Sequence, residues 1–332
     1  MTLATVDLSL FKSGRDVDRQ QFASQLLSSL SQHGFVKLVG HGISNAAISQ
    51  SFGWSKSFFQ LRTEDKLLIA NPGGPEPQRG WSAVGVESSS SLYRQGLLKS
   101  KITEDLRDAR EHFDQGSPND YQYPTRWPPE RELPGFRGFM EAFFEVLEGV
   151  AADLMAALEL AFGLPQGVFV DLITHEGNAS ELRLNHYPAI EVEQIKMGNV
   201  SRIWPHFDLG VITLLFQDEV GGLDFENRKQ RGTFSRVESS SPTEMVVNVS
   251  ETLQRWSNGT LPAGLHRVSL PRDFENHDSG TLPERYSIAY FCKADRSASV
   301  GSLTHFVLPG HDREYENISA LEYQQQRLKS AY

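Results

Sequence analysis

The pattern of apolar residues changes near residue 180, and this change most constrains the fold. Before it, apolar residues recur every three or four positions from Met140 to Phe162, and Gly163-Leu164-Pro165 follows. This pattern predicts a long helix with one buried face that ends at the glycine. After it come short strand-like runs broken by turn residues, at 182–187, 211–216, 244–249, 265–270 and 285–292. Several short strands separated by turns predict a sandwich or jelly roll.

The first 130 residues are predicted to mix helix and strand. Apolar residues between Phe22 and Leu30 fall on one helical face, and the pattern stops at His33-Gly34. Residues 35–39 have strand composition, and residues 45–60 return to a helical pattern. The segment 72–133 is rich in Gly, Pro, Ser and charge, so we predict surface loops and short elements there, of the kind that often cover a site.

Composition narrows the function classes. The chain has 332 residues and a net charge of −10, which argues against nucleic acid as a partner. Its single cysteine, Cys292, excludes an intrachain disulfide and suits a reducing compartment. Residues 1–16 do not resemble a signal peptide, and no apolar run approaches the roughly 18 residues of a membrane span. We therefore expect a cytoplasmic monomer or weak homo-oligomer with a small-molecule substrate.

Two histidines and an aspartate have the spacing of a metal site. His206 and Asp208 are two residues apart, so one strand end can direct both side chains to one point. His266 precedes a second strand-like run and can complete the set. Two histidines and one carboxylate leave coordination positions open and suit non-haem Fe(II), with zinc as the competing metal. Arg285 and Ser287 share one strand face further on and could bind a carboxylate, which favours iron.

The order of these motifs resembles the isopenicillin N synthase-like branch of the Fe(II)/2-oxoglutarate-dependent dioxygenases over most of the chain. The matching segments are Gly34-Phe35-Val36 with Gly40-His41-Gly42-Ile43, Leu184-Asn185-His186-Tyr187-Pro188, Pro205-His206-Phe207-Asp208, Ile212 to Asp218, Gly221-Gly222-Leu223, Asn248-Val249, Leu253 to Gly259, and Arg285-Tyr286-Ser287. Each segment is a weak signal alone, and their order makes the resemblance specific.

The resemblance implies a mainly β, α+β fold with a double-stranded β-helix (jelly-roll) core and an N-terminal helical scaffold. It implies Fe(II) on His206, Asp208 and His266, and O2 as co-reactant. The cosubstrate 2-oxoglutarate would bind Arg285 and Ser287, with Tyr187 and Asn185 in contact. The expected organisation is one catalytic unit over 1–332: a dioxygenase-type N-terminal region with lid loops at 1–130, a long supporting helix at 131–175, the jelly-roll core at 178–310 and a C-terminal helix at 311–332.

Three departures from the family pattern are visible. Ser250-Glu251 stands where the family often has Gly-Asp, and His186 replaces a tyrosine on the strand face opposite Tyr187. The spacing from His266 to Arg285 is also long. We interpret its extra residues, around 273–283, as an extended hairpin loop.

Strand alternation also suggests substrate contacts. Arg183 shares a face with Asn185 and Tyr187, so it either faces the cavity, where it could bind an acidic or phenolic substrate, or forms an ion pair outside the barrel. Trp204 and Phe291 have the alternation of His206 and Arg285 and are expected cavity walls or core residues. Trp81 and Arg94 are further expectations in the lid segment.

The implied function is oxidation of a small, aromatic or acidic secondary metabolite, with succinate and CO2 as coproducts. Hydroxylation, desaturation and ring rearrangement all remain open, whereas the carboxylate of Asp208 argues against halogenation. One alternative is an oxidase like isopenicillin N synthase, which uses no 2-oxoglutarate. Another is a jelly-roll protein that binds ligands without catalysis.

Overall fold

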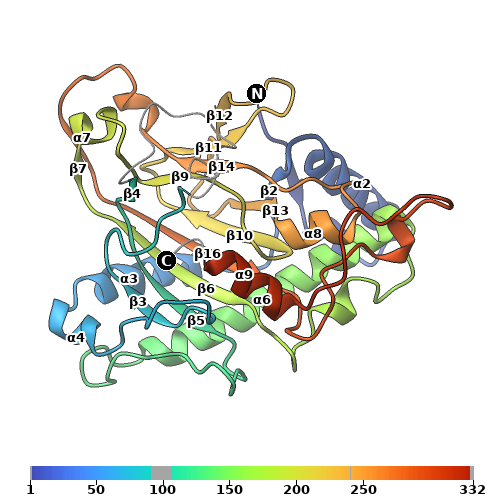
Figure 1. Cartoon of the computed structure of the whole chain (residues 1–332), viewed down its shortest axis with the longest axis horizontal. Coiled ribbons are helices and arrows are strands. Elements are labelled where there is room, and N and C mark those ends of the chain that lie inside the picture. Colours follow the sequence, from blue (N-terminus) through green and yellow to red (C-terminus); the bar gives the residue numbers. More distant parts are fainter. Residues whose placement is uncertain (1, 91–105, 240, 330–332) are drawn as a thin grey trace.

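The computed structural model describes residues 2–90, 106–239 and 241–329. Within these residues the largest sheet has eight strands (Figure 1). In spatial order they are β1 (Thr5–Asp7), β2 (Phe35–Val39), β13 (Met245–Val249), β10 (Ile212–Gln217), β16 (Arg285–Cys292), β6 (Glu181–Tyr187), β5 (Glu111–Gly116) and β3 (Gly80–Ser82). All neighbours in this order pair antiparallel except β1 and β2, which are parallel.

A second sheet faces the first across an apolar layer. Its strands in the described chain are β12 (Phe234–Arg236), β11 (Leu223–Glu226), β14 (His266–Val268) and β9 (Ile203–His206). Phe35 and Val246 of the larger sheet form one buried cluster with Phe225 and Val268 of the smaller sheet. Two sheets joined by such a layer form a sandwich, as the short strands predict.

The strand period of two separates the two faces of the larger sheet. On β6, Leu182 and Leu184 belong to the main apolar core, whereas Arg183, Asn185 and Tyr187 line a cavity between the sheets. The same alternation on β16 turns Ile288 and Tyr290 to the core and Arg285, Ser287, Ala289 and Phe291 to the cavity. One face of the sheet therefore carries the core, and the other carries the polar cavity.

Two long helices cover the core face. They are α2 (Asp16–His33) and α6 (Phe136–Phe162), which contact each other and also contact strands of the larger sheet (Figure 1). The predicted stripe at 140–162 is the buried face of α6. Both helices end at a glycine with a left-handed backbone, Gly34 (φ 75°) and Gly163 (φ 64°), as their sequences predict. At Gly34 a Cβ would also collide with the guanidinium of Arg228, which adds to the preference for glycine.

Shorter helices complete the fold. They are α1 (Ser9–Lys12), α3 (Asn45–Phe59), α4 (Thr63–Leu67), α7 (Val192–Lys196), α8 (Glu251–Trp256) and α9 (Ala320–Leu328). Among the described residues, no helix is both long and apolar enough to cross a membrane.

The N-terminal part is less helical than "helical scaffold" implies. It contributes β1, β2, β3 and β5 to the larger sheet. The sequence predicts surface loops and short elements over 72–133, and for the short strand β5 the predicted surface position is wrong. All six residues of β5 are buried, and the strand pairs with β6 along its whole length. Its sequence, Glu-His-Phe-Asp-Gln-Gly, has no apolar alternation, because His112 and Asp114 form ion pairs on one face and Phe113 is the one residue of the strand in the apolar core.

Among the described residues, four two-residue strands form two further small sheets. The extra residues before Arg285, which the sequence predicts as an extended hairpin loop, carry β15 (Thr281–Leu282), and this strand pairs with the remote β7 (Ile190–Glu191) rather than within a hairpin. A second pair joins β4 (Arg107–Asp108) to β8 (Val200–Ser201), which brings the segment after residue 105 next to β9.

Candidate active site

The structure brings His206, Asp208 and His266 together. His206 ends β9 and His266 begins β14, and the two residues are directly paired across the smaller sheet. Their Nε2 atoms lie 3.7 Å and 3.8 Å from Oδ1 of Asp208. One ligand atom from each of the three residues lies within 4.8 Å of the others. This is a cluster that a single metal ion can bridge.

Backbone carbonyls fix the orientation of both imidazoles. Nδ1 of His206 lies 2.8 Å from the carbonyl oxygen of Trp204, and Nδ1 of His266 lies 3.0 Å from that of Gly264. A proton on each Nδ1 satisfies these contacts and leaves the Nε2 lone pair facing the cluster. Burial, and then the neighbouring His266, lower the pKa of His206 to about 4. The neutral imidazole is the form that binds a metal.

Hydrogen bonds to one carboxylate oxygen of Asp208 leave the other oxygen available to a metal. Oδ2 of Asp208 accepts hydrogen bonds from Thr213 Oγ1 at 2.7 Å and from Asn248 Nδ2 at 2.9 Å, which leaves Oδ1 towards the histidines. Burial alone would raise the pKa of Asp208, but the two histidines and these donors hold it below its usual value. The group is therefore an ionised carboxylate with one free edge.

Arg285 lies in the same cavity with part of its guanidinium unused. Nε donates to the carbonyl of Gly221 at 2.9 Å, and Nη2 donates to Oε1 of Gln217 at 3.0 Å. Both acceptors are neutral, and the guanidinium lies over the ring of Tyr187 with its carbon 4.8 Å from the ring centre. Nη1 is buried and has no hydrogen-bond partner in the described part of the chain. A buried cation with a spare donor and no carboxylate partner fits an anionic ligand.

Ser287 and Asn185 continue this polar wall. They are opposite each other on β16 and β6, and Nδ2 of Asn185 lies 3.3 Å from Oγ of Ser287. Both side chains line the cavity with Tyr187 and the metal cluster. The four residues expected at a cosubstrate site therefore share one wall of it.

A second arginine, which sequence reasoning did not single out, lies behind this wall. Arg202 is fully buried between β8 and β9, and its Nη2 donates to the carbonyl of Pro283. Within the described residues its Nε and Nη1 have no partner. Burial, and then the charge of Arg285, lower the pKa of Arg202 to about 10. The group remains charged at pH 7, so it adds positive potential at the Arg285 end.

Of the two alternatives open for Arg183, the structure has the one in which it faces the cavity, but carboxylates already occupy its guanidinium. Its Nε lies 2.7 Å from Oδ1 of Asp114, and its Nη1 lies 2.9 Å from Oε2 of Glu87. Phe291 also lines the cavity, and the guanidinium carbon of Arg183 lies 5.6 Å from the centre of its ring. Arg183 therefore forms ion pairs, as in the second alternative, but it forms them inside the cavity rather than outside the barrel.

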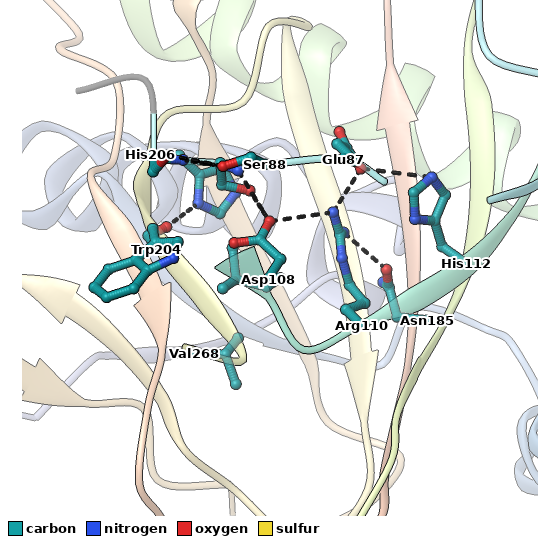
Figure 2. Close-up of polar contacts among 12 residues, drawn as sticks. Glu87, Ser88, Asp108, Arg110, His112, Asn185, Trp204, His206 and Val268 are labelled. Carbon is teal, nitrogen blue, oxygen red and sulfur yellow. Dashed lines mark hydrogen bonds and ion pairs between the residues drawn. The ribbon is translucent and has the colours of Figure 1, made fainter. Parts of the chain in front are cut away.

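Two tryptophans are not among the residues that line this cavity. Trp204 directs its indole towards β4, where Nε1 donates to the carbonyl of Arg107 at 3.1 Å, and Figure 2 shows its ring directed away from His206. Trp81 donates from Nε1 to Glu111 at 2.7 Å. Arg94 lies outside the described residues.

Glu87 and Arg110 are among the cavity residues that sequence reasoning missed. Glu87 Oε2 accepts from Arg110 Nη2 at 2.6 Å (Figure 2). It also accepts from Arg183 Nη1. Arg110 also donates from Nη1 to Oδ1 of Asn185 at 3.0 Å. Their sequence context offered no periodic signal, because Glu87 lies in a loop and Arg110 lies between the polar strands β4 and β5.

Comparison with known proteins defines the class. Residues 179–294 match the family model of the 2OG-Fe(II) oxygenase superfamily. Residues 3–130 match the N-terminal model described as non-haem dioxygenase in morphine synthesis. The chain belongs to the 2OG-Fe(II) oxygenases. It is a 2-oxoglutarate-dependent non-haem iron dioxygenase, an oxidoreductase that uses Fe(II), 2-oxoglutarate and O2.

Relatives match the chain along its whole length. The 2-oxoglutarate-dependent dioxygenase ucsF of an Acremonium species is 46% identical, and the alignment covers 100% of both chains. The proline hydroxylase buaE of Petromyces alliaceus is 38% identical, again over 100% of both. A full-length Neurospora crassa protein, solved in complex with alpha-KG and thymine, superposes with a TM-score of 0.86 at 30% identity. That match covers 99% of this chain and 97% of the other.

Proposed function

We propose that His206, Asp208 and His266 hold the Fe(II) and that Arg285 and Ser287 bind the far carboxylate of 2-oxoglutarate. The enzyme would then couple decarboxylation of 2-oxoglutarate to oxidation of a C–H bond in a small molecule. The observation that carries this proposal is the unused Nη1 of Arg285 in the cavity that also contains the metal cluster. Two neutral imidazoles and one carboxylate suit a divalent iron and leave positions open for other ligands.

Each residue has a distinct task in this proposal. Bound iron would supply the redox chemistry between O2, 2-oxoglutarate and the substrate. Thr213 and Asn248 fix the rotation of Asp208, and the carbonyls of Trp204 and Gly264 fix the two imidazoles. Arg285 orients the cosubstrate through its charge and spare donor, and Ser287, Asn185 and Tyr187 complete the polar wall. Burial of this wall excludes water and strengthens each electrostatic contact.

The substrate would be a small secondary metabolite that is hydroxylated, desaturated or rearranged. The relatives support a small polar substrate, since one is named a proline hydroxylase and the Neurospora crassa structure contains thymine. Phe291 supplies an aromatic wall, as an aromatic substrate would require. A purely acidic substrate would gain less from Arg183 than the sequence suggests, because Asp114 and Glu87 already compensate that charge.

The test is succinate formation by His206→Ala. We expect the variant to lose O2-dependent succinate formation, because removing one of the three ligands opens the iron site. His33→Ala, at the end of α2, is the matched control and should retain wild-type turnover. Circular dichroism should show both variants folded. Unchanged turnover in a folded His206→Ala protein would refute the ligand assignment. An iron-loaded wild type that oxidises substrate without consuming 2-oxoglutarate would instead indicate the oxidase alternative.

A further inference from the structure

Buried ion pairs line the cavity beyond the 2-oxoglutarate wall. On β6 and β16, Arg285 pairs with Tyr187, whereas Arg183 pairs with Ala289 four residues along the strand. At a rise of about 3.3 Å per residue, Arg183 lies roughly 13 Å from the Arg285 position along the sheet. The region around Arg183 is thus separate from the proposed cosubstrate site and shares the same cavity.

The charged groups in this region form a network in which each carboxylate has at least one cationic partner, and Glu87 and Glu181 each have two. Glu87 pairs with Arg110, Asp114 pairs with Arg183, and Glu181 pairs with Lys293. Burial, and then the charge of Arg183, hold the pKa of His112 well below its usual value, so this neighbour of Glu87 and Asp114 is neutral. The wall therefore carries both signs of charge with little net charge.

Stability does not account for this arrangement. Removing two charges from water costs several kcal/mol for each ion, and well-packed apolar residues would often be as stable. Of these six charged residues all but Asp114 line the cavity itself. Charged groups that converge on a cavity beside a metal cluster are typical of ligand recognition.

Arg110 and Glu87 offer two adjacent and opposite binding groups. Arg110 is 6% exposed, and its Nε is buried without a partner in the described chain. Its Nη2 lies 2.6 Å from Oε2 of Glu87 (Figure 2). Burial would raise the pKa of Glu87, but Arg183 and Arg110 hold it well below its usual range, so the carboxylate stays charged. A ligand here meets a guanidinium donor and a carboxylate acceptor side by side.

We propose that this pair binds the charged end of a zwitterionic α-amino or imino acid, with Arg110 taking the carboxylate and Glu87 the ammonium group. The proposal rests on the proposed function, because it assigns the substrate of that oxygenase. The substrate side chain would then lie against Phe291, Ala289 and Leu328, which also line the cavity. In hydroxylation, one oxygen atom of O2 replaces hydrogen as C–OH, and the other enters succinate as 2-oxoglutarate loses CO2.

The charge pattern excludes simpler ligands. A carboxylic acid without the amine would gain Arg110 but set its anionic group beside Glu87 without a compensating cation. An amine without the carboxylate would leave the Arg110 donor unsatisfied. A site that hydrogen-bonds a ligand group discriminates strongly against analogues that lack it, because its own buried groups lose their partners.

The first experiment uses wild-type enzyme with Fe(II), 2-oxoglutarate and all proteinogenic L-amino acids in turn. We expect at least one amino acid with an apolar side chain, or proline, to stimulate succinate release and to give an oxidised product by mass spectrometry. Its kcat/KM should exceed that of its deaminated acid and of its decarboxylated amine by at least about tenfold. The proposal is overturned if no amino acid stimulates turnover, or if the deaminated acid serves equally well.

Variants then assign the two groups separately. Glu87→Gln should reduce the kcat/KM preference for the amino acid over its deaminated analogue. Arg110→Gln should reduce the kcat/KM preference for the amino acid over its decarboxylated analogue. A merely structural role would lower turnover of all three compounds in parallel and would overturn the assignment. Glu64→Gln, an exposed glutamate, and Arg126→Gln, an exposed arginine, are the matched controls and should keep both preferences. If Arg110→Gln does not fold, Glu87→Gln and the analogue series with wild-type enzyme still test whether the pair binds a zwitterionic amino acid.

One control distinguishes this proposal from the proposed function. Anaerobic addition of 2-oxoglutarate to the Fe(II) enzyme should produce a visible charge-transfer band without any substrate. If the band forms and no amino acid is oxidised, the amino-acid proposal fails and the cosubstrate assignment stands. If the band does not form in iron-loaded protein, the proposed function itself fails.

Discussion

Two buried arginines on neighbouring strands face one cavity, and their surroundings give them different tasks. Arg285 and Arg183 both lie over an aromatic ring, that of Tyr187 and that of Phe291. Arg285 donates only to neutral oxygens and keeps Nη1 unpartnered within the described residues. Arg183 is bound by two carboxylates, those of Asp114 and Glu87. The charge of their partners, rather than their position on a strand, distinguishes these two arginines, since only Arg285 has no carboxylate partner among the described residues and can accept the carboxylate of the cosubstrate.

The largest expected effect comes from breaking the ion pair at the Arg183 end. Asp114→Asn should lower the free energy of unfolding by about 3–5 kcal/mol, because the variant leaves a buried guanidinium with one carboxylate fewer. Urea denaturation measures this change. Asp153→Asn, which breaks the surface pair with Lys12, should cost less than about 1 kcal/mol. If both substitutions cost the same small amount, Arg183 is not neutralised as we describe.

Asp108, next to this region, should make stability depend on pH. Burial raises the pKa of Asp108 from 3.8 to about 6. Its Oδ1 has no hydrogen-bond partner in the described chain. A raised acid pKa favours the protonated form in the folded state. Its contribution to stability is therefore full below about pH 4 and is lost as pH rises through about 6. The loss is about 3 kcal/mol at roughly 1.4 kcal/mol per pH unit.

Asp108→Asn removes this titration. The free energy of unfolding of the variant minus that of wild type should therefore be up to about 3 kcal/mol larger at pH 7 than at about pH 4. Urea denaturation at both pH values measures the difference. A stability difference that stays constant with pH would contradict the raised pKa.

The smallest effect concerns the C-terminal helix α9, which closes the cavity with Gln324 and Leu328. Glu251 anchors it by accepting from Tyr323 at 2.6 Å and from Arg327 at 2.8 Å. Arg327→Met should increase hydrogen exchange in α9 about fivefold, as expected for the loss of about 1 kcal/mol from a partly exposed pair.

The affinity for 2-oxoglutarate should not change in Arg327→Met, because Arg285 lies on a different wall. Arg313→Met, in the loop before α9, is the control and should leave exchange unchanged. Equal exchange in Arg327→Met and wild type would show that this ion pair does not hold the helix.

The sequence predicts the residues at the metal and Arg285 end of the cavity better than the contacts at the Arg183 end. His206, Asp208 and Arg285 could be predicted because strand period and motif order both depend on local spacing. The side-chain partners of Arg183 could not, since they come from β5 and from the loop around Glu87, both remote in sequence. The polar sequence of β5 resembles a loop, because ion pairs replace the apolar contacts that define a strand pattern. Trp204 shows a further limit, since its alternation is right for the cavity but its indole N–H binds the carbonyl of Arg107.

The most direct test compares the two arginines in one measurement, the anaerobic titration of the Fe(II) enzyme with 2-oxoglutarate. We predict that Arg285→Gln needs about 100-fold more 2-oxoglutarate to saturate the charge-transfer band, because it removes a buried charge from the cosubstrate's carboxylate. Arg183→Gln, if folded by circular dichroism, should stay within about threefold of wild type, since that guanidinium is already paired. Wild-type affinity in Arg285→Gln, or an equal loss in both variants, would contradict the division of the cavity into a cosubstrate end and a substrate end.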